Sequence, residues 1–441
     1  MTVPIATRID LASASRSELA AVIVRSAIPD ESIRRDAADI VSAVREGGDA
    51  ALDAYSTRFG GGPKSGDIIA TRDEMRQAHA DASRDFVDAI EKAVATIRAV
   101  HEPQIPRGLT TEPVRGVTIE RTWSPLRRVG VYVPGGAAAY PSSLLMSVVP
   151  AQVAGVPEIA VACPASDSGA IDTSVLCAAH VLGVSEVYTM GGAQAIGALA
   201  YGTETIPRVD KIVGPGGAWV TAAKLAVYGT VGIDLPAGPS EAAIVIDSTT
   251  DPVVAASDLL CQAEHGPDSV VMLVGTDRRL LDDVLDEASA QLEDLERRST
   301  ITEALARNGI VVFAESHPAA LRFVNDWAPE HVSLLTVDPA SDARSIPSAG
   351  SVLLGQWTPE SAGDYATGAN HVLPTGGLAR AYGPLSTEDF GSWRQIQELS
   401  QAGLMELAPT IRTIASREGL TAHAACVDVR INRMVSERSH P

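Results

Sequence analysis

Two side chains of metal-binding type stand three residues apart near the middle of the chain. Gln262 and His265 lie in residues 260–267, which resemble the end of a helix stopped by Gly266-Pro267. A helix would place both side chains on one face, and an amide oxygen beside an imidazole is half of a metal site. On this stretch alone, a polar helix end with His265 near the negative end of the helix dipole is the better interpretation. A metal site therefore needs ligands from other parts of the chain.

A carboxylate and an imidazole stand side by side at Glu330 and His331, after a helix expected at residues 318–327. Pro329 restrains the backbone before them, and adjacent residues of a loop can face one cavity. A histidine accepts an alcohol proton near neutral pH, and a neighbouring glutamate can activate water. A solvated turn is the alternative interpretation, and the pair alone does not exclude it.

Two further stretches combine carboxylates with imidazoles. Residues 362–371 include Asp364 and His371 between two prolines, which is typical of a long functional loop. Glu418 and His423 lie five residues apart at the start of the last expected helix. The four stretches together hold four of the nine histidines of the chain.

A cysteine also lies close to one of these histidines. Cys261 precedes His265 by four residues, so a helix could pair the thiol with the imidazole. Such a pair would suggest a thiohemiacetal intermediate of the aldehyde dehydrogenase type. A small buried side chain is the alternative, and it is the one we favour.

The elements that position these residues alternate between strand-like and helix-like segments from residue 128 onward. The first set has strands at 129–133, 159–162, 186–190 and 211–213, with helices at 142–154, 171–182, 193–201 and 218–228. The second set follows Pro239, with strands at 243–246, 270–274, 310–313 and 351–354, and helices at 252–264, 278–298 and 318–327. Helices at 30–59 and 71–100 precede them, a strand at 117–123 follows, and helices at 401–416 and 420–435 end the chain. We expect an α/β fold with two doubly wound, incomplete Rossmann-like domains and small helical N- and C-terminal segments.

Glycine-rich loops follow several strands of the first set, at Pro134-Gly135-Gly136, Gly191-Gly192 and residues 214–217. Open α/β sheets bind ligands at such strand ends. Neither Gly-x-Gly-x-x-Gly opening a helix nor Gly-x-x-x-x-Gly-Lys-Ser/Thr occurs, so the usual nucleotide fingerprints are absent. Dinucleotide binding and simple tight turns explain these loops equally well.

Composition limits the class of protein. The 441 residues require more than one domain, and 45% hydrophobic content indicates large cores. The net charge of −20 argues against nucleic acid or an anionic membrane as partner. Four scattered cysteines without a CxxC pair indicate neither a disulfide framework nor a thiolate zinc site. No apolar run has the length of a signal peptide or a membrane span, so we expect a soluble cytoplasmic protein.

A set of short motifs occurs in the order seen in histidinol dehydrogenases, and the chain resembles that family from about residue 127 to residue 423. The motifs are Tyr132-Val133-Pro134-Gly135-Gly136, Tyr140-Pro141-Ser142, Gly191-Gly192-Ala193-Gln194-Ala195, Ala237-Gly238-Pro239-Ser240-Glu241, Gln262-Ala263-Glu264-His265, Pro329-Glu330-His331, Gly363-Asp364-Tyr365 and Asn370-His371-Val372-Leu373-Pro374-Thr375. The combination is very specific, whereas the N-terminal helices fit only loosely.

The resemblance implies a reaction and a role for individual residues. The family oxidises an amino alcohol to an amino acid in two NAD-dependent steps through a bound aldehyde. Its catalytic pair falls on Glu330 and His331. Its zinc ligands fall on Gln262, His265, Asp364 and His423. Substrate-contacting positions comprise these four ligands with Ser240, His331, Tyr365, His371 and Glu418, and NAD-contacting positions fall on Tyr132, Gln194 and Gly217.

The resemblance also implies a domain arrangement and an assembly. Residues 1–29 would be an N-terminal arm, 30–127 with 240–385 a zinc-binding catalytic domain, 128–239 an NAD-binding Rossmann-like domain, and 386–441 a dimerisation segment. The family is a homodimer with a C-terminal crossover, so Glu418 and His423 would serve the site of the partner chain.

Two departures from the family pattern leave alternatives open. Gly217 stands where the family has an NAD-contacting asparagine, and Ala137 replaces another asparagine. A relative that oxidises another amino alcohol, or a diol such as sulfopropanediol, is therefore an alternative to histidinol oxidation. A regulatory protein that binds a metal or nucleotide is a third, but pure binding needs no base such as the Glu330-His331 pair beside the metal.

Overall fold

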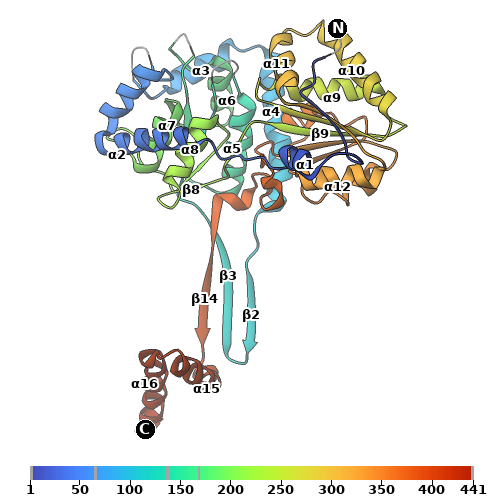
Figure 1. The fold of residues 1–441 in the computed structure, drawn as a ribbon. Helices are drawn as coiled ribbons and strands as arrows, with labels where there is room; N and C mark the ends of the chain where they lie inside the picture. The colour runs from blue at the N-terminus through green and yellow to red at the C-terminus, as the bar shows by residue number, and fades with distance from the viewer. Residues whose placement is uncertain (1–2, 64–66, 136–138, 167–168, 439–441) are drawn as a thin grey trace. The chain divides into compact units, whose positions relative to one another are not determined.

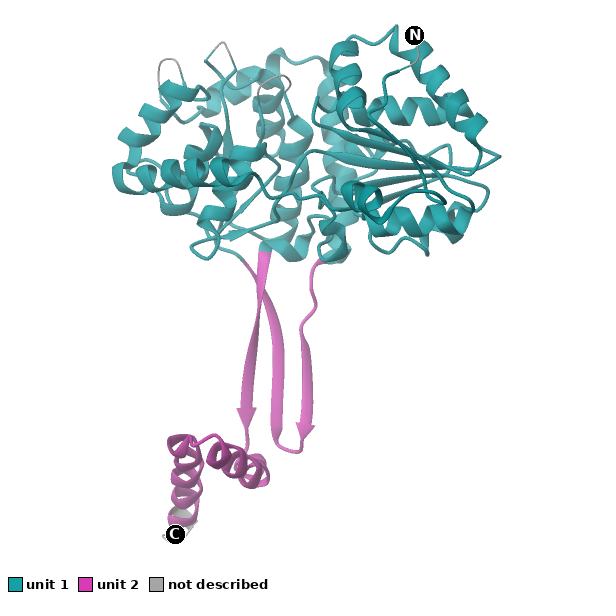
Figure 2. Cartoon of the chain, in the orientation of Figure 1, with its two compact units in different colours: residues 1–104, 126–390 teal, residues 105–125, 391–441 magenta. Residues whose placement is uncertain are grey.

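The computed structural model describes residues 3–63, 67–135, 139–166 and 169–438. Gly136 and Ala137 of the expected glycine loop lie outside these residues. The chain divides into two compact units, Met1–Gln104 with Leu126–Phe390 and Ile105–Pro125 with Gly391–Pro441 (Figure 2). Among the described residues, no helix combines the length and the apolar character that crossing a membrane requires.

The first half of the larger unit is a five-stranded sheet whose paired strands are all parallel, in the order β6-β5-β4-β7-β8. Its strands are β4 (Arg128–Tyr132), β5 (Glu158–Cys163), β6 (Glu186–Thr189), β7 (Lys211–Val213) and β8 (Gly232–Ile233), and its helices are α5 (Pro141–Ala154), α6 (Thr173–Val181), α7 (Gly192–Tyr201) and α8 (Ala218–Val227). The strand order reverses between β4 and β7, as in doubly wound sheets. The alternating pattern of the sequence predicted four of these five strands, but not β8.

The second half is a six-stranded sheet, also parallel throughout, in the order β1-β11-β10-β9-β12-β13. Its strands are β1 (Thr7–Asp10), β9 (Glu241–Ile246), β10 (Val270–Gly275), β11 (Gly309–Phe313), β12 (His331–Leu335) and β13 (Ser351–Leu354). Helices α9 (Pro252–Glu264), α10 (Arg278–Leu292) and α11 (Arg298–Asn308) cover one face, and α1 (Arg16–Ile23) and α12 (His317–Trp327) cover the other (Figure 1). Two short helices, α13 (Pro339–Ala343) and α14 (Glu360–Tyr365), complete it.

Three expectations for this half were wrong in detail. His331 is not in a loop but is the first residue of β12, a central strand paired with both β9 and β13. The single helix expected at 278–298 ends at Leu292, and α11 follows it. The N-terminal arm is not separate, because β1 pairs with β11 and completes the edge of the sheet.

The N-terminal helices α2 (Glu31–Phe59), α3 (Arg72–Asp81) and α4 (Arg84–His101) pack on the helices of the first sheet. The 71–100 segment forms two helices because Ser83 caps a new helix after Ala82. Gly197 of α7 permits the close approach of α2, since a Cβ there would lie 3.3 Å from the Cα of Val41. This packing places α2 to α4 against the helices of the first half.

The second unit is described by itself. An antiparallel sheet has the order β14-β3-β2, built from β14 (Gly391–Leu399), β3 (Val117–Pro125) and β2 (Leu109–Val114). Helices α15 (Gln401–Arg417) and α16 (Thr421–Arg438) follow and pack on each other. The 117–123 strand therefore belongs with the C-terminal segment, not with the catalytic half.

Candidate active site

A cavity of about 510 Å³ lies between the two halves of the larger unit. From the first half it receives the loops that follow β4 and β7, including Gly135 and Gly217. From the second half it receives residues at or before the starts of β9 and β12, including Ser240, Glu330 and His331. The first sheet thus presents the carboxyl ends of its strands, and the second sheet presents the amino ends.

A histidine and two carboxylates form the group best suited to a metal ion. Ligand atoms of His265, Glu360 and Asp364 lie within 4.8 Å of one another. His265 Nδ1 is 3.8 Å from Glu360 Oε1, and His265 Nε2 is 3.8 Å from Asp364 Oδ2. Glu360 and Asp364 are four residues apart on α14, so one helix face carries both carboxylates.

Gln262 lies on α9, one turn before His265. It is fully buried, and neither its amide oxygen nor its amide nitrogen has a hydrogen-bond partner among the described residues. Buried amides are normally paired, so an unpaired one needs an explanation. An amide oxygen, an imidazole and a carboxylate are a donor set that binds zinc, and these residues fit that ion.

His371 lines the same cavity and lies next to Asp364. Its Nδ1 lies 3.1 Å from the carbonyl oxygen of Asp364 and 3.8 Å from the carboxylate Oδ1 of the same residue. Burial lowers the pKa of His371, and the carboxylate of Asp364 opposes that effect. Tyr365 follows Asp364, is largely exposed, and lines the same cavity.

Glu330 and His331 lie at the amino end of β12 and are both buried. A left-handed turn at Ala328 ends α12 and directs the chain into the strand. Glu330 Oε2 accepts a hydrogen bond of 2.8 Å from the backbone N–H of Glu241, at the start of the neighbouring strand β9. The ladder to β9 and β13 holds His331.

The surroundings shift the pKa of these two residues in opposite directions. Burial raises the pKa of Glu330 well above its usual value, and the nearby carboxylates of Glu241, Glu360 and Asp364 raise it further. Burial lowers the pKa of His331 to about 3, and two neighbouring histidines contribute. At neutral pH His331 is therefore a neutral imidazole. Its Nδ1 has no hydrogen-bond partner among the described residues, so this atom is open to a bound molecule.

The residues expected at the cofactor lie around the carboxyl ends of the first sheet. Tyr132 ends β4, is buried, and its hydroxyl accepts a 3.2 Å hydrogen bond from the backbone N–H of Gly192. Gln194 is buried in the first turn of α7. Neither is among the described residues that line the cavity, whereas Gly217 does line it and precedes α8 as its N-cap.

Two expected site residues belong to the second unit. Glu418 follows α15 and His423 lies in the first turn of α16, and both are exposed there. The larger unit therefore brings together Gln262, His265, Asp364, Glu330 and His331, and it does so without these two. Ser240 lines the same cavity.

The sequence interpretation missed Glu360. The available signal was its spacing of four residues to Asp364 directly after Pro359, a residue typical of helix starts. Cys261 also has a defined place, half-buried on α9, where burial and nearby carboxylates raise its pKa to about 12. A thiol in that environment is a poor nucleophile, which disfavours the thiohemiacetal alternative.

Fold and site together define an α/β protein of the enzyme class, in which a buried glutamate–histidine pair and a histidine–carboxylate group line one cavity. The family model described as histidinol dehydrogenase matches residues 24–431. The chain is 47% identical over 401 residues to histidinol dehydrogenase of Halobacterium salinarum, covering 91% of this chain and 93% of the relative. It is 41% identical to the Vibrio vulnificus enzyme of the same name over 428 residues, covering 96% and 98%.

A solved structure gives the same result. The crystal structure of histidinol dehydrogenase from Elizabethkingia anophelis matches with a TM-score of 0.91 and 36% identity, covering 97% of this chain and 98% of that one. The chain belongs to the histidinol dehydrogenase family, and it is an oxidoreductase.

Proposed function

We propose that the protein oxidises L-histidinol to L-histidine with two NAD and one water, through a bound aldehyde, in the last step of histidine biosynthesis. The observation that carries this proposal is the burial of Glu330 and His331 side by side in the cavity that also holds His265 and Asp364. Two oxidations of one carbon need a base for the alcohol proton and a base for water, and this pair supplies both. The relatives named above do not favour the alternative of another amino alcohol or a diol.

We assign zinc to Gln262, His265 and Asp364 of one chain together with the partner's His423. The unpaired buried amide of Gln262 and the 3.8 Å spacing between His265 and Asp364 support this assignment. When bound, zinc would supply a Lewis acid that holds the amine and hydroxyl of the substrate and polarises the reacting oxygen. The partner's ligand requires a homodimer in which residues 386–441 cross over.

The residues of the chain carry the proton transfers. His331 is neutral and accepts the alcohol proton as hydride leaves for NAD. Glu330 then removes a proton from the water that adds to the aldehyde, and its raised pKa makes it a stronger base than an exposed glutamate. Burial keeps bulk water away from both steps. Ser240, Tyr365, His371 and Glu418 would hold the rest of the substrate.

The carboxyl end of the first sheet is the proposed NAD site. Its strand order reverses between β4 and β7, and the loops after both strands reach the cavity. We assign Tyr132, Gln194 and Gly217 to the cofactor, with residues 128–239 as the NAD-binding half and 240–385 as the catalytic half. Tyr132 and Gln194 would act by supporting the Gly191-Gly192 turn.

The test combines a substrate panel with one variant. NADH formation is measured with histidinol and with a panel of amino alcohols and diols, with and without a chelator. We expect histidinol to give the largest kcat/KM and the chelator to abolish it. Glu330→Gln should retain alcohol oxidation within about threefold, while acid formation falls by about 10² or more. A larger response to another alcohol overturns the substrate, and two unaffected steps overturn the role of Glu330.

A further inference from the structure

The segment before α2 forms part of the cavity wall, although it lies far from the active-site strands in the sequence. Residues 26–29 line the cavity. The segment passes close to two glycines, Gly238 before β9 and Gly376 after β13. A Cβ on Gly376 would lie 2.4 Å from the backbone nitrogen of Ala27, and one on Gly238 would lie 3.2 Å from its Cα. A side chain at Gly376 would collide with the segment, and one at Gly238 would crowd it.

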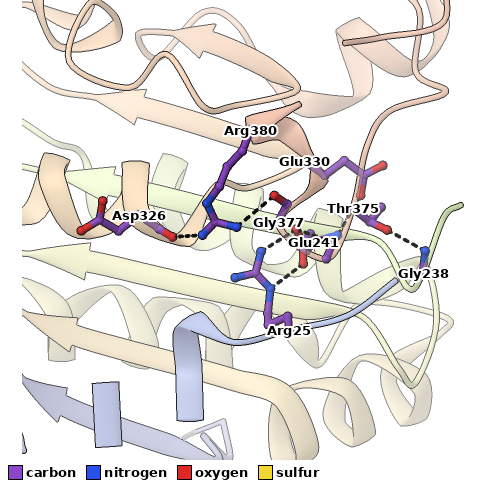
Figure 3. A network of polar contacts seen from close by, with 9 residues as sticks. Arg25, Gly238, Glu241, Asp326, Glu330, Thr375, Gly377 and Arg380 are labelled. Carbon is purple, nitrogen blue, oxygen red and sulfur yellow. Dashed lines mark hydrogen bonds and ion pairs between the residues drawn. The ribbon is translucent and has the colours of Figure 1, made fainter. Parts of the chain in front are cut away.

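Arg25 ties this segment to the start of β9. Its Nε and Nη2 donate hydrogen bonds of 2.9 and 2.7 Å to the two carboxylate oxygens of Glu241, a bidentate ion pair (Figure 3). Its guanidinium lies over the Trp327 ring, 3.8 Å from the centroid. The side chains of Arg25 and Glu241 are only 13% and 3% exposed, so solvent screens the pair weakly. Glu241 also accepts a hydrogen bond of 3.1 Å from the backbone N–H of Gly376.

Glu241 also holds Glu330, the proposed water-activating base. The backbone N–H of Glu241 donates to Glu330 Oε2, and this is the hydrogen bond that orients the Glu330 carboxylate in the cavity. Gly238 also lies close to the 26–29 segment. Its backbone N–H donates a 2.6 Å hydrogen bond to Thr375 Oγ1. Arg25 is therefore linked to Glu330 through Glu241: Arg25 binds the Glu241 side chain, and the Glu241 backbone, which pairs with strand β10, donates to Glu330.

We propose that Arg25 is a positioning residue for Glu330, through the Glu241 ion pair, and that it serves the oxidation of the aldehyde more than the oxidation of the alcohol. This inference rests on the proposed function. His331 lies in the ladder between β9 and β13, so loss of the N-terminal tie leaves its backbone held on both sides. Glu330 precedes the strand; its carbonyl accepts from the Ser351 N–H, whereas its carboxylate accepts from the Glu241 N–H. A displacement of about 1 Å costs a reacting group on the order of 10²-fold in rate.

The experiment supplies histidinol and the aldehyde separately to the zinc-loaded full chain. Arg25→Met keeps much of the aliphatic part of the side chain and removes the guanidinium group. We expect kcat with the aldehyde to fall at least tenfold and kcat for the first oxidation to fall less than about threefold. Zinc content and the KM for NAD should not change. Arg25→Lys keeps the charge and one hydrogen bond, so it should recover part of the lost aldehyde rate.

The matched control is Arg380, on the loop that contacts the same segment. Arg380 Nη1 donates to the carbonyl oxygen of Gly377 at 3.0 Å, and Arg380 also binds the carbonyl oxygen of Asp326, but it does not bond to Glu241 or Glu330 (Figure 3). Arg380→Met should leave the ratio of the two rates unchanged. A similar selective loss in this variant would show that any loosening of the loop suffices, and would overturn the role of Arg25.

A second variant separates positioning from an unpaired buried charge. Arg25→Met leaves the Glu241 carboxylate without its partner, which can unfold the protein. Arg25→Met/Glu241→Gln removes both charges and retains the Glu241 N–H. We expect the same selective loss in the double variant, and recovery of the aldehyde rate there would overturn the proposal. Equal losses in both steps, or none, would also overturn it. Glu330→Gln tests the proposed function separately, because its result does not depend on Arg25.

Discussion

The two α/β halves present opposite edges of their sheets to one cavity. In the first half, the cavity meets the carboxyl ends of β4 and β7, where doubly wound sheets usually bind ligands. In the second half it meets the amino ends of β9 and β12, so that residues which start strands carry the chemistry. The two halves therefore have similar folds but different roles. They differ in which edge of the sheet faces the cavity between them.

The amino edges of the two sheets show what that difference does to charge. In the first sheet, β4, β5 and β6 begin with Arg128, Glu158 and Glu186, and the guanidinium donates to both carboxylates at 2.9 and 3.0 Å. In the second sheet, β12 is preceded by Glu330, whose carboxylate is buried near other carboxylates. At the first edge the arginine pairs with its carboxylates, whereas at the second edge Glu241 has Arg25 as partner and Glu330 has no cation bound to it among the described residues. A buried carboxyl group with a strongly raised pKa is typical of a functional site.

The largest expected effect comes from removing the base at the second sheet's amino edge. His331→Asn keeps a polar side chain but cannot accept the alcohol proton, so kcat with histidinol should fall by about 10²–10⁴. The measurement is steady-state NADH formation, with a thermal melt to verify folding. Glu158→Gln, at the start of β5 in the other sheet, is the matched control and should leave kcat unchanged. If kcat of His331→Asn falls by less than about threefold, His331 is not the base, and the amino edges of the two sheets do not differ in their role in catalysis.

A smaller effect should appear at the carboxyl edge of the first sheet. Gly217 is the N-cap of α8, with an ordinary φ of −69°, and a Cβ there meets nothing within 4 Å. Gly217→Asn therefore fits without strain, and one added hydrogen bond of about 0.5–1.5 kcal/mol should lower the KM for NAD roughly 2–10-fold at unchanged kcat.

The control for that variant makes the same substitution at the opposite edge of the same sheet. Gly183 lies between α6 and β6. A Cβ added there would meet nothing within 4 Å, and its φ of 67° is one that asparagine tolerates. Gly183→Asn should leave the KM for NAD unchanged. If Gly217→Asn leaves it unchanged as well, the cofactor does not lie at the β7 loop.

Strand and helix alternation was predictable because each element has its own local pattern. The strands β4 to β7 of the first half and β9, β10, β11 and β13 of the second were expected from apolar runs and glycine turns, whereas β1, β8 and β12 were not. β12 was missed because it is short and contains His331 and Ser333, a polar residue that donates a hydrogen bond to buried Asp258. Tertiary pairing, not the local pattern, makes this segment a strand.

The site was predictable where motifs carry it and not where long-range packing does. Gln262 and His265 are neighbours on one helix, and their spacing was visible in the sequence. Glu360 and Arg25 were missed because their partners, His265 and Glu241, come from other elements. The sequence also did not predict which edge of each sheet faces the cavity, because the order of strands and helices is the same in both cases.

The smallest expected effect belongs to the amino edge of the first sheet. Hydrogen bonding to Arg128 holds the pKa of Glu186 below its usual value of 4.5. A carboxylate with a lowered pKa in the folded state stabilises the protein above the pKa of the unfolded chain, and the contribution disappears as pH falls through the folded pKa. Because Glu186 is partly exposed to solvent, Glu186→Gln should cost no more than about 1 kcal/mol at pH 7.

Thermal melts of Glu186→Gln and the unaltered protein from pH 7 down to pH 3.5 test this contribution. The melting temperature of the variant should be lower by about 2–4 °C at pH 7, and the gap should close as pH falls below 4.5. Its kcat at pH 7 should stay the same. A gap that widens on acidification would mean that Glu186 is not stabilised by Arg128, and a fall in kcat would mean that this edge also contributes to catalysis. Either result would break the division of work between the two sheets.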